Sequence, residues 1–321
     1  MNAKDLRIVF MGTPEFAVPS LRALVDGGYN VVAVVTAPDK PAGRGQQLRK
    51  SEVKIAAEEL GLPVLQPEKL RAPEFVEQLQ ALQPDLGIVI AFRMLPEVIW
   101  SMPRLGTFNL HASLLPQYRG AAPINWAIIN GETETGITTF LLNHAIDEGA
   151  ILGQQRVPIG PEENVGTLYD RLMTLGPSLV LDTVERLAAG EVQPVEQTQI
   201  EAGALKPAPK IFKEDGRIDW HREGRRIVDF VRGLSPYPAA WSPLFRDGRE
   251  VNSAKIFAVR FEPGMPAAPG TVRTDNRDEL SVACADGWIR LLEVQLAGKR
   301  RMSVHDLLLG FRDIADYAFA E

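Results

Sequence analysis

The sequence predicts an α/β fold in two parts: a doubly wound, mostly parallel sheet followed by a smaller β-barrel domain. Over the first 190 residues, near-continuous apolar runs alternate with helical patterns. Such runs are typical of parallel strands buried on both faces, and the alternation indicates βαβ units. Beyond this region, short strand-like pieces separated by Pro and Gly turns predict a barrel. We therefore expect domains over residues 1–190 and 214–321, joined by a linker over residues 191–213.

In the first domain, the early strands are predicted from apolar runs and the helices from apolar residues recurring every three or four positions. The expected strands are Leu6–Met11, Val31–Val35, Leu86–Phe92, Gly136–Leu142 and Ala150–Pro158. The expected helices are Phe16–Asp26, Glu52–Leu60, Pro73–Leu82, Ile124–Ile129 and Thr167–Ala189. Gly61 stands where a residue that ends the second helix is expected.

The segment from Gly190 to Lys213 has no strong period and contains three prolines, so it is expected to be a linker. A single helix is expected after it, over His221–Gly233. The strand-like pieces of the second domain are Lys255–Phe261, Gly270–Arg273, Leu280–Ala283 and Ile289–Gln295. Their short lengths and regular turns favour a small barrel.

Composition indicates a soluble globular protein, with 45% hydrophobic and 24% charged residues. No apolar run is long enough to span a bilayer, and we expect neither a cleavable leader nor a membrane partner. The only cysteine is Cys284, so the chain is expected in a reducing cytoplasm. One cysteine and four histidines give no metal-ligand spacing, and we expect no metal. The net charge of −6 argues weakly against nucleic acid, although the second half of the chain is relatively basic.

Phe10–Phe16 reads FMGTPEF and follows the first predicted strand, at a helix start where a phosphate could bind. Pro14 and Glu15 stand where a dinucleotide-binding loop needs glycines. A tight turn is therefore the better interpretation, and a nicotinamide cofactor is not expected.

Residues 39–50 form a loop longer than most connections between a strand and a helix, with four cations, one anion and two glycines. Such a loop suits phosphate binding, although it is equally compatible with a solvated surface loop. Its position at the carboxyl end of the second strand, on the edge where the site described next is expected, favours substrate binding. The cations are Lys40, Arg44, Arg49 and Lys50.

Asn109 and His111 lie two apart in a predicted strand, so their side chains project from one face. The Leu-Leu-Pro run that follows ends the strand, which leaves both groups at its carboxyl end, where open α/β sheets bind ligands. A buried structural pair is the alternative. If Asp147 returns beside His111, however, an amide, an imidazole and a carboxylate surround one point.

These three groups suit the chemistry of a carbonyl. The carboxylate would orient the imidazole and stabilise its cationic form, and the amide and the ring would hydrogen-bond an oxyanion. Ser113 is the nearest hydroxyl and has no evident activating base. The sequence therefore favours direct transfer of an acyl group to an incoming nucleophile, without a covalent enzyme intermediate.

At these residues the chain resembles the 10-formyltetrahydrofolate-dependent formyltransferases. The shared signature comprises Asn109, His111, Ser113–Pro116 and Asp147–Gly149. Narrower features resemble the branch of that family that acts on methionyl-tRNA and extend over nearly the whole chain. They are Phe10–Phe16, Lys40–Leu48, Arg119–Ile124, Lys210–Trp220 and Gln295–Ser303.

The resemblance implies a Rossmann-like catalytic domain and an OB-like second domain that contacts tRNA. It implies transfer of the formyl group of 10-formyltetrahydrofolate to the α-amine of methionyl initiator tRNA, through an oxyanion-stabilised tetrahedral intermediate. The product, N-formylmethionyl-tRNA, serves translation initiation. A cytoplasmic monomer is expected.

The resemblance also assigns roles. The catalytic residues would be Asn109, His111 and Asp147, and residues 40–50 would hold the acceptor end of the tRNA through Lys40, Arg44, Arg49 and Lys50. Folate would lie against Ser113, Leu114, Leu115 and Pro116, and against Arg93, Met94 and Leu95.

The sequence departs from the family pattern in two places. Ala91–Pro96 reads AFRMLP where Ala-Tyr-Gly, an aliphatic pair and Pro are common, so the folate contacts there are expected to differ. Arg49–Glu52 reads RKSE where a more apolar run with a proline is common, so the basic loop is expected to bind the tRNA through different contacts.

Three other functions remain compatible with these residues. A sugar-nucleotide N-formyltransferase would use the same site but gives no reason for the basic loop. A formyltetrahydrofolate hydrolase would replace the amine with water and would need no platform for a large substrate. A non-enzymatic folate- or RNA-binding module would not need the Asn, His and Asp set.

Overall fold

The computed structural model describes residues 2–42 and 47–320. It divides into two compact units, each assembled from several stretches of the chain. The first unit comprises Met1–Gly120, Gly136–Val157 and Asp170–Pro207. The second comprises Ala121–Thr135, Pro158–Tyr169 and Ala208–Glu321. The domain limits expected from the sequence, at residues 190 and 214, stay a prediction.

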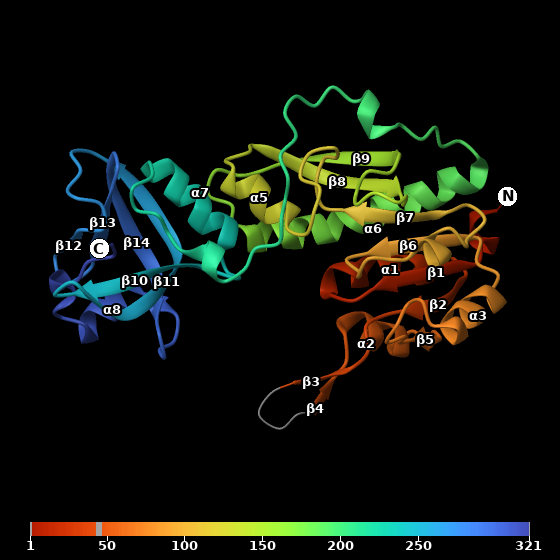
Figure 1. Cartoon of the computed structure of the whole chain (residues 1–321), viewed down its shortest axis with the longest axis horizontal. Helices are drawn as coiled ribbons and strands as arrows, with labels where there is room; N and C mark the ends of the chain where they lie inside the picture. Colours follow the sequence, from red (N-terminus) through yellow and green to blue (C-terminus); the bar gives the residue numbers. More distant parts are fainter. Residues whose placement is uncertain (1, 43–46, 321) are drawn as a thin grey trace. The chain divides into compact units, whose positions relative to one another are not determined.

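The first unit is built on a sheet with the strand order β5-β2-β1-β6-β7-β8-β9 (Figure 1). The strands are β1 (Ile8–Gly12), β2 (Val31–Val35), β5 (Val64–Leu65), β6 (Leu86–Ile90), β7 (Thr107–His111), β8 (Glu134–Leu141) and β9 (Ile151–Pro158). The first five of these pair in parallel, and β8 pairs antiparallel with β7. β1 and β6 are buried along their whole length, as their apolar sequences predict.

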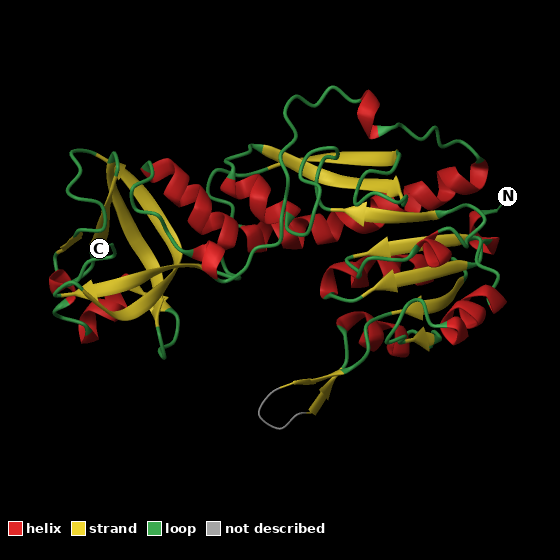
Figure 2. Ribbon diagram, in the orientation of Figure 1, coloured by secondary structure: helices red, strands yellow, loops and turns green. Residues whose placement is uncertain are grey.

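Helices lie beside this sheet (Figure 2). They are α1 (Val18–Asp26), α2 (Glu52–Glu59), α3 (Pro73–Ala81), α4 (Glu97–Trp100) and α6 (Val165–Ala189). Phe75 of α3 and Ile99 of α4 share a core with Val9 and Met11 of β1. Alternate β1 residues therefore face the other side of the sheet. The structure confirms the predicted doubly wound, mostly parallel fold.

The strand order places a switch point between β1 and β6. From β1 the chain moves outward to β2 and β5, then crosses back to β6 and β7 on the other side. Open α/β sheets bind ligands outside the carboxyl ends of the strands at such a point. β7 lies one strand away, with Asn109 in register with Val89 of β6.

The loop predicted over residues 39–50 contains a hairpin of β3 (Lys40–Ala42) and β4 (Gln47–Arg49). At its base, Lys54 Nζ of α2 donates to the Asp39 carboxylate at 2.6 Å, and Gln66 Nε2 donates to the same carboxylate at 2.8 Å. These hydrogen bonds hold the pKa of Asp39 below its ordinary value. The hairpin thus begins from a fixed point beside the carboxyl end of β2.

The second unit contains a curled antiparallel sheet with the order β10-β11-β14-β13-β12, and β15 pairs with β14. Its strands are β10 (Ala240–Arg246), β11 (Arg249–Pro263), β12 (Val272–Thr274), β13 (Leu280–Cys284), β14 (Gly287–Leu296) and β15 (Met302–Ser303). Ala318 bridges Phe245 on one edge and Thr271 next to the other edge, so the tail connects the two ends of the sheet. This agrees with the predicted barrel.

The helices α5 (Pro123–Ile129), α7 (Gly224–Leu234) and α8 (Val304–Gly310) belong to this unit. Ile227 of α7 and Leu308 of α8 enter the same core as Trp220, whose indole Nε1 donates to Ser242 Oγ at 2.9 Å. Within the described residues of both units, no helix combines the length and the apolar character needed to cross a membrane.

Candidate active site

The site begins at the carboxyl end of β7, where the strand ends at His111 and the chain turns. Thr138 of β8 holds this turn, because its hydroxyl donates to the Ser113 carbonyl at 2.6 Å. Ser113 Oγ in turn donates to the Gln117 carbonyl at 2.7 Å. The turn is therefore fixed by the neighbouring strand.

The imidazole of His111 is buried and its orientation is set by the backbone. His111 Nε2 lies 2.9 Å from the carbonyl oxygen of Tyr118. A carbonyl can only accept, so Nε2 carries a proton. Nδ1 is then the ring nitrogen left to exchange a proton with a substrate.

Asp147 lies beside this ring, as the sequence expects, although its contact is not a hydrogen bond. Asp147 Oδ2 is 3.9 Å from His111 Nδ1 and accepts from the Gly120 amide at 2.9 Å. The side chains of Asp147 and His111 are only 15% and 7% exposed. At this distance the two groups make no direct hydrogen bond, and the Tyr118 carbonyl orients the ring.

Gly149, two residues after Asp147, lies where the loop passes close to the end of β8. A Cβ at this position would lie 1.6 Å from the Leu141 carbonyl oxygen at the end of β8. Only glycine allows the backbone to pass so close to β8. This close approach brings the loop that carries Asp147 back toward β7.

Asn109 supplies the third group, two residues before His111 on the same face of β7. Its Oδ1 atom is buried and has no hydrogen-bond partner among the described residues. The two ends of an amide are assigned from their partners, so either end could face a ligand. A half-buried amide with an unpartnered oxygen, next to an imidazole of fixed orientation, can hydrogen-bond a polar ligand.

The turn residues expected to contact folate face mainly inward. Ser113, Leu115 and Pro116 are buried, and Leu115 packs with Phe140 and Ile151. Leu114 is half-buried and fits against Gly136, where a Cβ would clash with it. These side chains shape the turn, and a ligand resting on it would meet chiefly its backbone.

The loop after β6 carries the other expected folate residues, which point in different directions. Arg93 donates to the carbonyl oxygens of Pro67 and Glu68, and burial lowers the pKa of its guanidinium. Leu95 enters the core beneath α3 and α4. Met94 alone of the three is well exposed, at 72%.

Two of the four expected cations of this loop, Arg49 and Lys50, have partners on α2. Arg49 pairs with Glu52 at 3.0 Å, and Lys50 pairs with Glu58 at 2.7 Å. The bond to Glu58 raises the pKa of Lys50. Lys40 stands opposite Arg49 in the hairpin. Arg44 lies outside the described residues.

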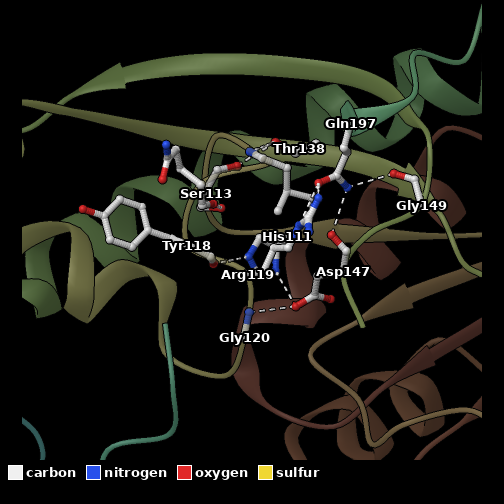
Figure 3. A network of polar contacts seen from close by, with 11 residues as sticks. His111, Ser113, Tyr118, Arg119, Gly120, Thr138, Asp147, Gly149 and Gln197 are labelled. Carbon is white, nitrogen blue, oxygen red and sulfur yellow. Dashed lines mark hydrogen bonds and ion pairs between the residues drawn. The ribbon is translucent and has the colours of Figure 1, made fainter. Parts of the chain in front are cut away.

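A network that sequence reasoning missed surrounds Asp147 (Figure 3). Gln197 donates from Nε2 to the carbonyl oxygens of Asp147 and Gly149 at 2.9 and 2.8 Å. Its Oε1 accepts from Arg119 Nε and Nη2. Gln197 comes from the segment expected to be a linker, where no local pattern marks it. In the described parts of the chain, no group of His, Cys, Asp or Glu is arranged to hold a metal.

Comparison with known proteins shows the family to which the chain belongs. The family model described as "Formyl transferase" matches residues 6–184, and that for "Formyl transferase, C-terminal domain" matches residues 210–312. A methionyl-tRNA formyltransferase of Parabacteroides distasonis is 56% identical over 321 residues, covering 99% of both chains. The chain therefore belongs to the formyl transferase family and is a transferase.

Solved structures show the same fold at low identity. WlaRD, a sugar 3N-formyl transferase crystallised with dTDP and 5-N-formyl-THF, has a TM-score of 0.65 at 18% identity, with 92% of this chain and 99% of that chain covered. HypX of Aquifex aeolicus in complex with tetrahydrofolic acid has a TM-score of 0.60 at 20% identity. The match covers 94% of this chain and 47% of HypX, so this chain spans about half the length of that protein.

Proposed function

We propose that the protein transfers the formyl group of 10-formyltetrahydrofolate to the α-amine of methionine esterified to initiator tRNA. The observation that carries the proposal is the convergence of Asn109, His111 and Asp147 at the carboxyl end of β7. Support for the tRNA substrate comes from relatives named methionyl-tRNA formyltransferase at 56% identity over nearly the full chain.

The folate would lie along the carboxyl edge of β6 and β7. Ser113–Pro116 would offer the backbone of the turn, and Met94 an exposed apolar side chain from the adjoining loop. The folate supplies the formyl group, and its nitrogen is the leaving group when the formyl carbon is attacked. The Nδ2 group of Asn109 would donate to the formyl oxygen, with the side chain turned by a ligand that supplies the partner its buried Oδ1 lacks.

During attack, the amine nitrogen bonds to the formyl carbon and the carbonyl oxygen gains negative charge. Asn109 Nδ2 would donate to that oxygen. His111 can donate to it only from Nδ1, because its Nε2–H is committed to the Tyr118 carbonyl. Donation from Nδ1 requires the ring to carry a proton on both nitrogens, with Asp147 Oδ2 at 3.9 Å as the neighbouring carboxylate.

The step balances through one proton. The attacking amine loses a proton after its bond to carbon has formed, and the folate nitrogen gains one as its bond to carbon breaks. The Asp147 carboxylate would accept the proton that the amine loses, and His111 Nδ1 would give its proton to the folate nitrogen; the proton on Asp147 would then return to His111. The chain thus needs no covalent intermediate.

The hairpin would hold the acceptor end of the tRNA through Lys40, Arg49 and Lys50, with Arg44 in the part that is not described. Like charges directly opposite each other destabilise a hairpin, and Lys40 faces Arg49. A phosphate between them would remove that repulsion. The second unit, with its barrel, would provide a further tRNA surface. The predictions that the protein is monomeric and cytoplasmic stay predictions.

The proposal is tested by following a labelled formyl group. Wild-type protein is given labelled 10-formyltetrahydrofolate with methionyl initiator tRNA, with a sugar-nucleotide amine, or with buffer alone. We expect label on the methionyl amine and little turnover in the other two reactions. Label on the sugar would indicate an N-formyltransferase for nucleotide sugars, and release as formate in buffer would indicate a hydrolase. Either result would overturn the proposal.

A further inference from the structure

Gln197 is the most enclosed polar side chain of the segment that follows α6, with 3% of its surface exposed. Its amide makes four hydrogen bonds: two donated from Nε2 and two accepted by Oε1. All of its partners belong to two backbone segments beside His111. A side chain buried with every polar atom satisfied holds its partners in place.

The two segments that Gln197 connects each hold one member of the His111 and Asp147 pair. The turn over residues 118–120 supplies the Tyr118 carbonyl to His111 and the Gly120 amide to Asp147. The loop over residues 147–149 carries Asp147 itself. Gln197 reaches the turn through Arg119 and the loop through two carbonyl oxygens (Figure 3).

Both segments have backbone conformations that need support. Tyr118 and Asp147 have φ values of 60° and 56°, which L residues with a Cβ rarely adopt. Such conformations persist when the surrounding structure over-determines them. The hydrogen bond from Gln197 to the Asp147 carbonyl acts at one of these positions.

The same segment is tied to the turn at further points. Gln117 Nε2 donates to the Ala202 carbonyl at 2.6 Å, and its Oε1 accepts from the Lys206 amide at 2.8 Å. The Tyr118 amide donates to the Lys206 carbonyl at 2.8 Å. Ile200 packs beside Leu115 in the core of the turn. Residues 197–206 therefore form a strap along the turn that orients His111.

We propose that Gln197 is a positioning residue for formyl transfer, which fixes the separation of His111 and Asp147 by holding the 118–120 turn and the 147–149 loop together. This rests on the proposed function. Gln197 acts on the pair only through backbone groups and Arg119. Its loss should therefore lower the rate of the chemical step and leave substrate binding nearly unchanged.

The test uses Gln197→Ala with Gln199→Ala as the matched control, since Gln199 is exposed on the same short helical turn. A misplacement of about 1 Å can cost roughly 100-fold in rate. We expect kcat of Gln197→Ala to fall about 10- to 100-fold, with KM for folate and tRNA within about 2-fold. The control should keep wild-type values. A rise in KM at unchanged kcat, or equal effects of the two variants, would overturn the proposal.

A second measurement reads the position of His111 without activity. The other three histidines, His144, His221 and His305, are 75%, 71% and 53% exposed, and replacing them with Gln leaves His111 as the single histidine. Nitrogen-15 NMR of its ring should show Nε2 protonated in this background. Adding Gln197→Ala should shift the ring signals, because the turn that carries the Tyr118 carbonyl loses its connection through Arg119 to Gln197. Unchanged ring signals would contradict the proposal.

If Gln197→Ala does not fold, Gln197→Glu keeps the volume and the acceptor for Arg119 but places an oxygen against the carbonyls of Asp147 and Gly149. We expect it to lower kcat as well, and wild-type kcat in this variant would sink the proposal. Absence of formyl transfer by the wild-type protein would instead remove the proposed function, while the NMR result on His111 would still decide whether Gln197 positions the ring.

Discussion

The Nε2–H of His111 is hydrogen-bonded to the backbone carbonyl of Tyr118 at 2.9 Å, so the ring faces Asp147 with Nδ1. This one hydrogen bond decides which nitrogen can take part in the reaction. It also makes the backbone of the turn after β7, rather than a carboxylate, the element that orients the His111 imidazole.

The first prediction concerns Gly149. Replacing it with Ala places a Cβ in the space of the Leu141 carbonyl oxygen, so the loop that carries Asp147 must move. We expect a loss of about 1–3 kcal/mol in the free energy of unfolding and a large loss of formyl transfer. Urea unfolding and kcat measure the two effects. Gly264→Ala is the control, because nothing lies within 4 Å of its Cβ position. Wild-type stability and activity in Gly149→Ala would contradict the role of the close approach.

The second prediction concerns the hairpin cations. Replacing Lys40, Arg49 and Lys50 with Gln should weaken tRNA binding and make its salt dependence less steep. The slope of log K against log salt should fall by about 0.7–0.9 for each phosphate that the hairpin no longer neutralises. The control variant also loses three positive charges, but at positions elsewhere on the first unit. It replaces the exposed residues Lys4, Lys69 and Arg71 with Gln. An unchanged slope in the hairpin variant would rule out phosphate binding by these cations.

The third prediction concerns the carboxylate that competes for Lys50. Glu58 holds Lys50 at 2.7 Å, so Glu58→Gln should free the ammonium for a phosphate. Surface ion pairs are worth roughly 0.2–1 kcal/mol, so we expect tRNA affinity to rise by up to about 5-fold. Glu59→Gln removes the same charge from the same helix but frees Arg22 instead. If both variants bind tRNA equally well, the gain reflects net charge and not the release of Lys50.

The fourth prediction is a pH dependence at the base of the hairpin. The pKa of Asp39 is lowered in the folded protein by hydrogen bonds from Lys54 and Gln66. The ionised Asp39 carboxylate therefore stabilises the fold fully at a pH well above its ordinary pKa of 3.8. This stabilisation is lost as the pH falls through the lower pKa that Asp39 has in the folded protein. Asp39→Asn should be less stable than wild type at pH 7, with a difference that shrinks below about pH 4. Urea unfolding of both proteins across this pH range measures the difference in stability. A difference that does not change with pH would contradict the stabilising role of the Asp39 carboxylate.

Local pattern predicts most of the first unit, because its strands are apolar runs that need no tertiary information. It does not predict β10, since Pro243 interrupts the sequence of that strand. Pro243 is tolerated because β10 is the edge strand of the sheet. The expected elements also lack α8, although Ser303 caps it by accepting from the Asp306 amide, a pattern visible in the sequence.

For the site, the sequence places Asn109 and His111 on one face of a strand, and the family resemblance adds Asp147 as the third group. The roles of the Tyr118 carbonyl and of Gln197 could not be predicted. Gln197 lies 50 residues from Asp147 in a segment without a period, and its burial and its hydrogen bonds exist only in the folded structure. The ion pairs of Arg49 and Lys50 with α2 likewise follow from the hairpin geometry.

The most direct test of the account is single-turnover formylation of methionyl initiator tRNA by Asn109→Ala at saturating 10-formyltetrahydrofolate. Removal of one oxyanion donor should lower the rate about 10²–10³-fold and leave folate affinity largely intact. A rate near that of the wild type would contradict the assignment of Asn109 and His111 as the groups that stabilise the transferred formyl oxygen.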